Sequence, residues 1–164
     1  MKLDEEAARV AVGLRLGLDL CVPHECHCGS RVDACGVHSF VCKTAPGKTI
    51  RHHALNDLIA RAFSSAGLPV TKEPSGLFRL DGKRPDELTL VPWSSGKALC
   101  WAVTVTCPLA ESYINAAAPE CGAAAEIAAS RKEEKYADLD GRYIFELIAL
   151  ETLGVFNTSA RQLL

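Results

Sequence analysis

Two strand-like segments joined by a tight turn restrict the fold of this chain more than any other feature. They cover Asp86–Val91 and Leu99–Thr106, and the sequence Pro-Trp-Ser-Ser-Gly lies between them. Side chains alternate along the second segment, so that successive residues fall on opposite faces of a strand. One face carries Leu99, Trp101, Val103 and Val105, and the other carries Cys100, Ala102, Thr104 and Thr106. The pattern predicts two neighbouring strands of one sheet.

Pro85 and Asp86 open the first of these strands, so a carboxylate stands at its beginning. Hydrolytic metal sites often pair such a carboxylate with a second one partway along the neighbouring strand, and the metal ion lies between them. Ala102 occupies that second position in this chain and offers no carboxylate. The sequence therefore predicts a metal site from which one of two acidic ligands is missing.

Length and composition indicate one globular domain with a substantial core. The chain has 164 residues, of which 48% are hydrophobic and 23% are charged. No apolar run reaches the roughly 20 residues of a membrane span, and the first residues, MKLDEEAARVAVGL, are too acidic for a signal peptide. We therefore expect a cytosolic or nuclear protein with reduced thiols. The net charge of −2 argues against a strong global attraction to nucleic acid, although the basic residues are locally clustered.

A segment rich in cysteine and histidine lies in the first third of the chain. Five of the eight cysteines and three of the five histidines fall between Cys21 and Cys42. With reduced thiols, this density indicates zinc rather than disulfides. Tetrahedral zinc needs four ligands held by short turns, for which Gly29 and Gly36 are suited. The best set has the spacing C-x-C, nine residues, H-x3-C, and consists of Cys26, Cys28, His38 and Cys42.

Two further side chains in this segment compete as ligands, namely Cys35 and His24. The alternative interpretation is a loop with small buried cysteines and no metal. Because four protein ligands leave no open coordination position, we expect a structural zinc that stabilises the segment and does no chemistry itself.

The remaining pattern predicts a helix, three strands, a helix and a final strand, which together form a mixed sheet covered by helices. The expected elements are a preceding helix over Asp4–Leu16, a helix over Thr49–Ala66, a strand over Leu68–Glu73, the two strands above, a helix from Pro119 to about Leu139 and a strand over Arg142–Leu150. The tail after Asn157 is expected to be loose. The predicted divisions are an N-terminal helical segment (1–20), the zinc segment (21–48) and an α/β domain (49–164).

Several side chains are candidates for contact with a phosphate backbone or a metal ion. Glu73 ends the strand before the Pro-Asp pair and is a further metal-proximal carboxylate. The loop after it is basic at its end, and basic residues also occupy the first turn of the second helix. The side chains of that turn either reach phosphate, with one histidine able to approach the zinc site, or are simply solvated. These candidate DNA contacts are Arg51, His52, Arg79, Lys83 and Arg84.

Lys132 and Lys135 lie on the face of the last predicted helix that otherwise packs against the sheet. Either is a surface lysine with a buried stem or a functional group that points toward the metal site. The residues leave the choice between the two lysines open.

These motifs together resemble the restriction-like endonuclease domain, of the PD-(D/E)xK class, of site-specific non-LTR retrotransposons. The resemblance rests on the C-x-C, H and C knuckle, on Arg84-Pro85-Asp86, on the strand Trp101-Ala102-Val103-Thr104-Val105 and on K-x-x-KY at 132–136, and it covers most of the chain. It implies a PD-(D/E)xK core in residues 49–164. It further implies that an aspartate belongs at position 102, and that the catalytic lysine has moved from position 104, here Thr104, to the next helix.

The resemblance implies a metal-dependent DNA endonuclease that nicks target DNA to prime reverse transcription in the nucleus. Mg²⁺ or Mn²⁺ would bind Asp86 and a carboxylate at 102, and a lysine would orient the attacking water. Element RNA and the reverse transcriptase domain of a parent polyprotein are further expected partners. With Ala102, we expect this chain to bind DNA but to cleave it poorly or not at all. Ala102 is either a substitution in an active enzyme, which we favour, or the mark of a natural copy that has decayed or been co-opted. The alternative is a non-catalytic, zinc-stabilised module that binds nucleic acid or protein.

Overall fold

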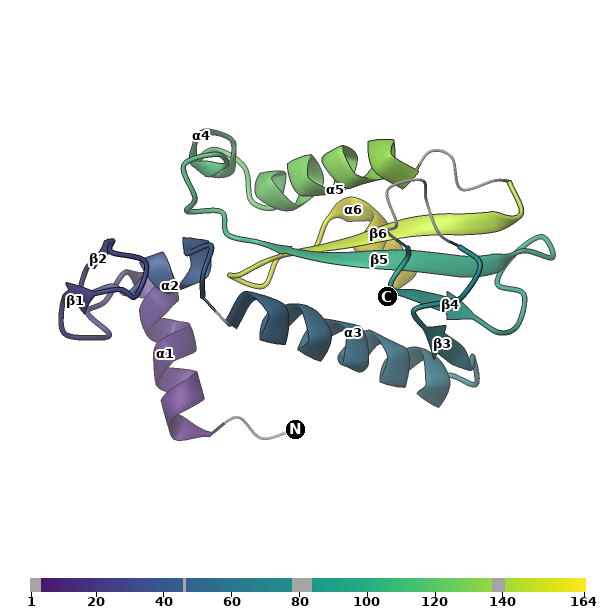
Figure 1. Ribbon diagram of the computed structural model, residues 1–164, viewed down its shortest axis with the longest axis horizontal. Helices are drawn as coiled ribbons and strands as arrows, with labels where there is room; N and C mark the ends of the chain where they lie inside the picture. Colours follow the sequence, from purple (N-terminus) through teal and green to yellow (C-terminus); the bar gives the residue numbers. More distant parts are fainter. Residues whose placement is uncertain (1–3, 46, 78–83, 137–140) are drawn as a thin grey trace.

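The computed structural model describes residues 4–45, 47–77, 84–136 and 141–164. A four-stranded mixed sheet lies between helices in these residues, and a smaller N-terminal module precedes it in the chain (Figure 1). The order of helix, three strands, helix and strand after that module agrees with the sequence prediction. The sheet consists of β3 (Val70–Lys72), β4 (Glu87–Thr89), β5 (Ala98–Thr106) and β6 (Tyr143–Glu151).

The four strands lie side by side in the order β3-β4-β5-β6. β3, β4 and β5 pair antiparallel, whereas β5 and β6 pair in parallel along their whole length. β4 pairs with β5 only through Glu87, opposite Trp101, and Leu88, opposite Cys100. Among the described residues, the edge of β5 beyond Trp101 therefore has no strand partner, and side chains can reach its backbone there.

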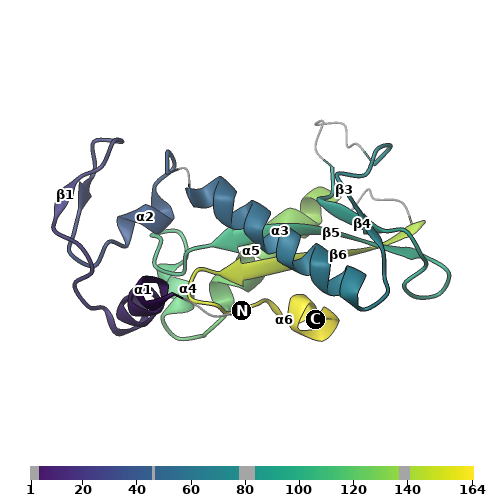
Figure 2. The same cartoon turned by 90° about the horizontal axis from the view of Figure 1, so that it is seen from below.

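Helices cover both faces of the sheet and produce its alternating pattern. The helices α3 (Gly47–Ser65) and α6 (Thr158–Leu163) pack on one face, and α5 (Ala123–Tyr136) packs on the other (Figures 1 and 2). On the α3 face, Trp101 is fully buried and stacks on Phe63 with 4.8 Å between ring centroids. On the α5 face, Ala102 packs against small side chains of the helix. The predicted alternation of β5 is thus confirmed.

The N-terminal module lies at one end of the sheet, beside the start of α3 (Figure 1). It contains α1 (Glu5–Leu16), a hairpin of β1 (His24–Glu25) and β2 (Arg31–Val32), and a short helix α2 (His38–Val41). Asp4 caps α1 by accepting a hydrogen bond from the Ala7 N–H at 2.7 Å, and Gly17 ends the helix at a positive φ of 65°. Arg15 ties α1 to the domain by donating to the Leu153 carbonyl at 2.7 Å.

The expectation of a loose C-terminal tail is wrong. After a turn, the chain forms α6 and packs the fully buried Ala160 into the core. Asn157 is buried, and its side chain accepts from the Ala149 N–H and donates to the Leu147 carbonyl, each at 2.9 Å. These bonds satisfy backbone groups at the outer edge of β6, which explains why the tail is fixed.

Boundaries of the other elements shift by a few residues. The helix expected from Pro119 begins at Ala123 and follows a short helix, α4 (Ile114–Ala117), while residues 137–140 lie outside the described part. Within the described ranges, none of the helices combines the length and apolar character that crossing a bilayer requires.

Candidate functional site

Four side chains of the N-terminal module form a group that could hold a metal ion. The ligand atoms of Cys26, Cys28, His38 and Cys42 all lie within 4.8 Å of one another. The sulfur atoms of Cys26 and Cys42 are 3.8 Å apart, and 3.2 Å separates the Cys28 sulfur from His38 Nε2. A tetrahedral zinc with bonds of about 2.3 Å to sulfur would place two thiolates about 3.8 Å apart. The spacing therefore fits a tetrahedral ion.

Tight backbone turns bring these ligands together. Cys26 and Cys28 lie in the loop of the β1–β2 hairpin, where Gly29 adopts a φ of 83° that favours glycine. His38 begins α2 and Cys42 follows its last residue. The two competing ligands bond elsewhere: Cys35 donates to the Gly17 carbonyl at 3.7 Å, and His24 Nδ1 lies 2.9 Å from the Val22 carbonyl. The predicted set of four is therefore confirmed as a group that could hold a metal.

Hydrogen bonds prepare two of the thiols for metal binding. The hydroxyl and the backbone N–H of Ser30 stabilise the thiolate of Cys28 and lower its pKa to about 7. Thr44 lowers the pKa of Cys42 in the same manner. Because the thiolate is the form that binds metals, these bonds reduce the cost of deprotonation near neutral pH.

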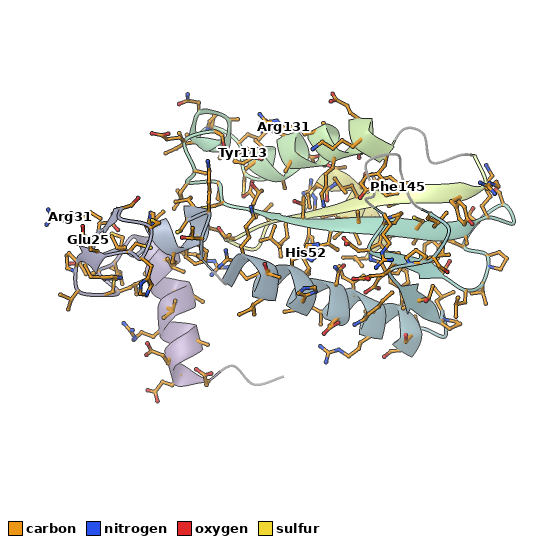
Figure 3. The ribbon with its side chains drawn as sticks, viewed as in Figure 1. Glu25, Arg31, His52, Tyr113, Arg131 and Phe145 are labelled. Carbon is orange, nitrogen blue, oxygen red and sulfur yellow. The ribbon has the colours of Figure 1, made fainter. Side chains whose placement is uncertain are left out.

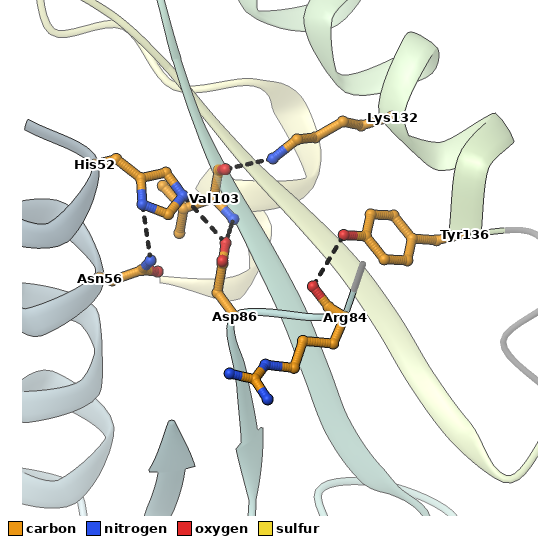
Figure 4. Close-up of polar contacts among 7 residues, drawn as sticks. All are labelled: His52, Asn56, Arg84, Asp86, Val103, Lys132 and Tyr136. Atoms are coloured by element: carbon orange, nitrogen blue, oxygen red, sulfur yellow. Dashed lines mark hydrogen bonds and ion pairs between the residues drawn. The ribbon is translucent and has the colours of Figure 1, made fainter. Parts of the chain in front are cut away.

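A second site lies at the unpaired edge of β5, around the backbone of Val103 (Figure 4). The Val103 N–H donates to Asp86 Oδ2 at 2.6 Å, and Lys132 Nζ donates to the Val103 carbonyl at 2.6 Å. The Asp86 N–H also donates to the Trp101 carbonyl at 2.9 Å, which fixes where the aspartate leaves the sheet. The side chains of Asp86 and Lys132 thus bond the Val103 N–H and C=O groups that a neighbouring strand would otherwise bond.

The surroundings of Asp86 keep its carboxylate ionised. Burial raises its pKa, but hydrogen bonds from His52 and from the Val103 N–H, together with the positive charge of Lys132, outweigh that effect and leave the pKa below its ordinary value. His52 Nε2 lies 3.4 Å from Asp86 Oδ2, and Asn56 lies behind the imidazole ring, 3.5 Å from Nδ1 (Figure 4). Asp86 is therefore a charged carboxylate in a partly enclosed position.

Position 102 is apolar in this chain. Ala102 is 1% exposed and packs with Ala125, Ala129 and Leu147 beneath α5. Its side chain points to the same face of the sheet from which Lys132 reaches β5. A carboxylate at this position would therefore be buried on the lysine side of Asp86, whereas the present side chain supplies only packing.

The last turns of α5 separate the two candidate lysines. Lys132 is half-buried and bonds to β5, whereas Lys135 is exposed. The nearby Tyr136 is buried, stacks on Phe145 with 4.6 Å between centroids, and donates its hydroxyl to the Arg84 carbonyl at 3.1 Å. Of the two lysines, only Lys132 therefore lies beside Asp86, and Tyr136 holds the backbone of Arg84, two residues before that aspartate.

A cavity of about 270 Å³ opens beside Asp86. It lies between α3, the end of β3 and the start of β4. Its lining is polar and consists of His52, His53, Asn56, Asp57, Lys72, Glu73, Asp86 and Glu87. Glu73 adopts a positive φ of 47° and forms an ion pair with Arg84. The sequence-based candidates Glu73, Asp86 and His52 thus meet around one cavity.

Sequence reasoning missed Glu87 in this cavity. Its side chain is 1% exposed, and burial raises its pKa to about 7. Among the described residues, neither carboxylate oxygen has a hydrogen-bond partner. The pairing of Glu87 with Trp101 places it on the buried α3 face. No local signal predicts this burial, because alternation places Glu87 with Thr89 on the face opposite the apolar Leu88 and Leu90.

The remaining predicted DNA contacts fall in different places. Arg51 is half-buried, and its guanidinium lies over the ring of Phe40 in α2 at 5.1 Å, so it links the N-terminal module to α3. His52 lies against Asp86, as described above, and not at the Cys/His group. Arg79 and Lys83 lie outside the described residues. A comparable cation–π pair, Arg131 over Tyr113 at 5.4 Å, joins α5 to the segment before α4 (Figure 3).

Comparison of the chain with protein-family models and with curated protein sequences gives no match. The residues themselves therefore carry the functional argument. They provide a Cys/His group that could hold a metal ion, and a separate edge where an ionised carboxylate, a lysine and a histidine surround one backbone position of β5.

Proposed function

We propose that this chain is a metal-dependent DNA endonuclease domain of the PD-(D/E)xK class from a non-LTR retrotransposon, and that Ala102 disables it. In its intact form, the domain would nick target DNA to prime reverse transcription. One observation carries the proposal: Asp86 and Lys132 converge on Val103 at the open edge of β5, directly beside position 102. The mixed sheet with α3 and α5 on opposite faces is compatible with this class.

Each residue has a defined task in this reaction. A bound Mg²⁺ or Mn²⁺ ion polarises the phosphate and lowers the pKa of an attacking water. Asp86 would hold that ion, since its carboxylate is ionised and half-enclosed. Lys132 would stabilise the charge that develops on the phosphate, and its position favours it over the exposed Lys135. With Ala102, the ion lacks a ligand on the lysine side.

We assign a structural zinc ion to Cys26, Cys28, His38 and Cys42, because three thiolates and one imidazole are typical zinc ligands. The contact between Arg51 and Phe40 would transmit the order of this module to the start of α3, where His52 meets Asp86. DNA is the proposed substrate and partner. Element RNA and the reverse transcriptase domain of a parent polyprotein are further proposed partners in the nucleus.

A nicking assay on supercoiled plasmid with Mg²⁺ or Mn²⁺ tests the proposal. We expect the Ala102→Asp chain to nick the plasmid, and the chain with Ala102 to be at least about a hundredfold slower. Adding Asp86→Asn or Lys132→Met to the Ala102→Asp chain should abolish nicking, whereas Lys135→Met should leave most of it. If the Ala102→Asp chain binds plasmid, is folded and still does not nick it, the endonuclease assignment is wrong.

The burial of Ala102 among alanines favours a second candidate, a nucleic-acid-binding module without catalytic activity. An apolar contact at this position suits a protein that uses the edge of β5 for structure alone. This candidate predicts DNA binding that weakens steeply with salt, together with no nicking by the Ala102→Asp chain. Absence of DNA binding at any salt concentration would leave a protein-interaction role.

A further inference from the structure

Glu87 presents an electrostatic problem that the proposed reaction does not use. Its side chain is 1% exposed, and both carboxylate oxygens lack a hydrogen-bond partner within the described ranges. Burying an ionised carboxylate without a partner costs several kcal/mol, so native proteins rarely leave one in this state. Such a side chain fits a site that a water molecule or an ion completes.

The neighbouring basic side chain does not resolve the problem. Lys72 lies directly opposite Glu87 in the pairing of β3 with β4. Its ammonium group instead forms an ion pair with Asp57 of α3, and more than half of the lysine side chain is exposed. The protein thus surrounds Glu87 with two further carboxylates, Asp57 and Asp86, while the closest lysine is engaged by one of them.

The cavity beside Glu87 is lined by side chains of the kind that a hard divalent cation takes as ligands. It is about 270 Å³ in volume, which accommodates an ion with several water ligands, and it is lined by Glu87, Asp86, Glu73 and His52. His52 Nε2 and Asp86 Oδ2 are 3.4 Å apart. Adjacent ligands of an octahedral ion with bonds of about 2.1 Å lie about 3 Å apart, so this pair is close to a chelating arrangement.

We propose that Glu87 and Asp86 together bind one divalent cation of the Mg²⁺ and Mn²⁺ class from the α3 side of the sheet, so that Glu87 replaces the carboxylate absent at position 102. The role of the ion in hydrolysis rests on the proposed function, whereas the binding of the ion does not depend on it. Position 102 and Lys132 approach β5 from the opposite face, beneath α5. An ion held by Glu87 therefore lies away from the lysine, which explains how this chain can retain cation binding without efficient hydrolysis.

The binding of Mn²⁺ to zinc-loaded protein tests the inference. Free Mn²⁺ is followed by electron paramagnetic resonance during titration of the native chain, of Glu87→Gln and of Asp86→Asn. The control is Glu134→Gln, which removes an exposed carboxylate from α5. We expect one tightly bound Mn²⁺ ion per native chain, an affinity lower by about tenfold or more in the first two variants, and no change in the control. Mg²⁺ should displace the bound ion.

A second measurement locates the ion without relying on a variant. Bound Mn²⁺ broadens nearby proton resonances, so the ring signals of His52 should disappear at one equivalent, while those of His38 in the Cys/His group persist. Equal Mn²⁺ affinity of the native and Glu87→Gln chains, or the absence of bound Mn²⁺ in the native chain, would overturn the inference. If Mn²⁺ binding depends on Glu87 but the Ala102→Asp chain does not nick plasmid, the proposed function fails and the inference stands. If the Ala102→Asp chain nicks plasmid but Mn²⁺ binding does not depend on Glu87, the proposed function stands and the inference fails.

Discussion

The substitution Glu87→Gln should stabilise the protein, by an amount that grows as the pH rises from about 4.5 to about 7. Burial raises the pKa of Glu87 from its ordinary value of 4.5 to about 7. Between these values the folded chain keeps a proton that the unfolded chain has already released. The free energy of unfolding therefore falls as pH rises through this window. Glutamine is neutral at every pH, so it removes this loss while it keeps the size and shape of the side chain.

The expected magnitude follows from the difference between the two pKa values. One pKa unit corresponds to about 1.4 kcal/mol, so ionising Glu87 in the folded protein costs about 3 kcal/mol at pH 8. At pH 5 the folded Glu87 is protonated and resembles glutamine, and the two chains should differ by less than about 1 kcal/mol. Asp86 does not interfere, because its pKa is lowered and its contribution is lost only at more acidic pH.

Urea unfolding of zinc-loaded protein at pH 5 and pH 8, without Mg²⁺ or Mn²⁺, measures this difference. Fluorescence of the buried Trp101 reports the transition, and Glu134→Gln is the matched control. A Glu87→Gln chain that is no more stable than the native chain at pH 8 would refute the reasoning, since Glu87 would then have a partner. Addition of Mn²⁺ should stabilise the native chain more than the variant, because the variant is expected to bind the ion more weakly.

Three further predictions concern the lysine, the C-terminal segment and the zinc group. Lys132→Met should lower the free energy of unfolding by about 1–2 kcal/mol, because the Val103 carbonyl of β5 loses its hydrogen-bond partner. The control Lys135→Met removes an exposed side chain and should change this free energy by less than about 0.5 kcal/mol. Equal urea unfolding curves for the two variants would contradict the bond between Lys132 and β5. Asn157→Ala should cost about 2–4 kcal/mol, since it leaves two backbone groups of β6 unpaired, and a loss below 1 kcal/mol would show that the tail is dispensable. Removal of zinc by a chelator should speed amide hydrogen exchange in residues 24–42 and leave exchange in β5 unchanged. Zinc affinity should fall as the pH drops below about 7, where Cys28 takes up a proton. A zinc affinity that does not depend on pH would argue against thiolate ligands.

The sequence predicted the parts of this protein that depend on local spacing. The alternation along β5, the apolar stripe of α3 and the four ligands of the Cys/His group each follow from residues that are close together in the chain. The C-terminal segment was predicted incorrectly, because Asn157 is fixed by bonds to the edge of β6 that no local pattern reveals. Glu87 was missed because its surroundings come from α3, β3 and β5.

The sequence by itself determined which chemical groups this protein has: an aspartate at the start of a strand, an alanine where a second carboxylate is expected, two candidate lysines and a Cys/His set with zinc spacing. Only the tertiary structure decided how they are used. It placed Lys132 against the backbone of β5 and left Lys135 exposed, placed His52 beside Asp86, and buried Glu87 without a partner among the described residues. The physical reason is that periodicity specifies which face of an element a side chain occupies. Contacts between elements then determine which atoms meet there and whether the solvation that each loses is replaced.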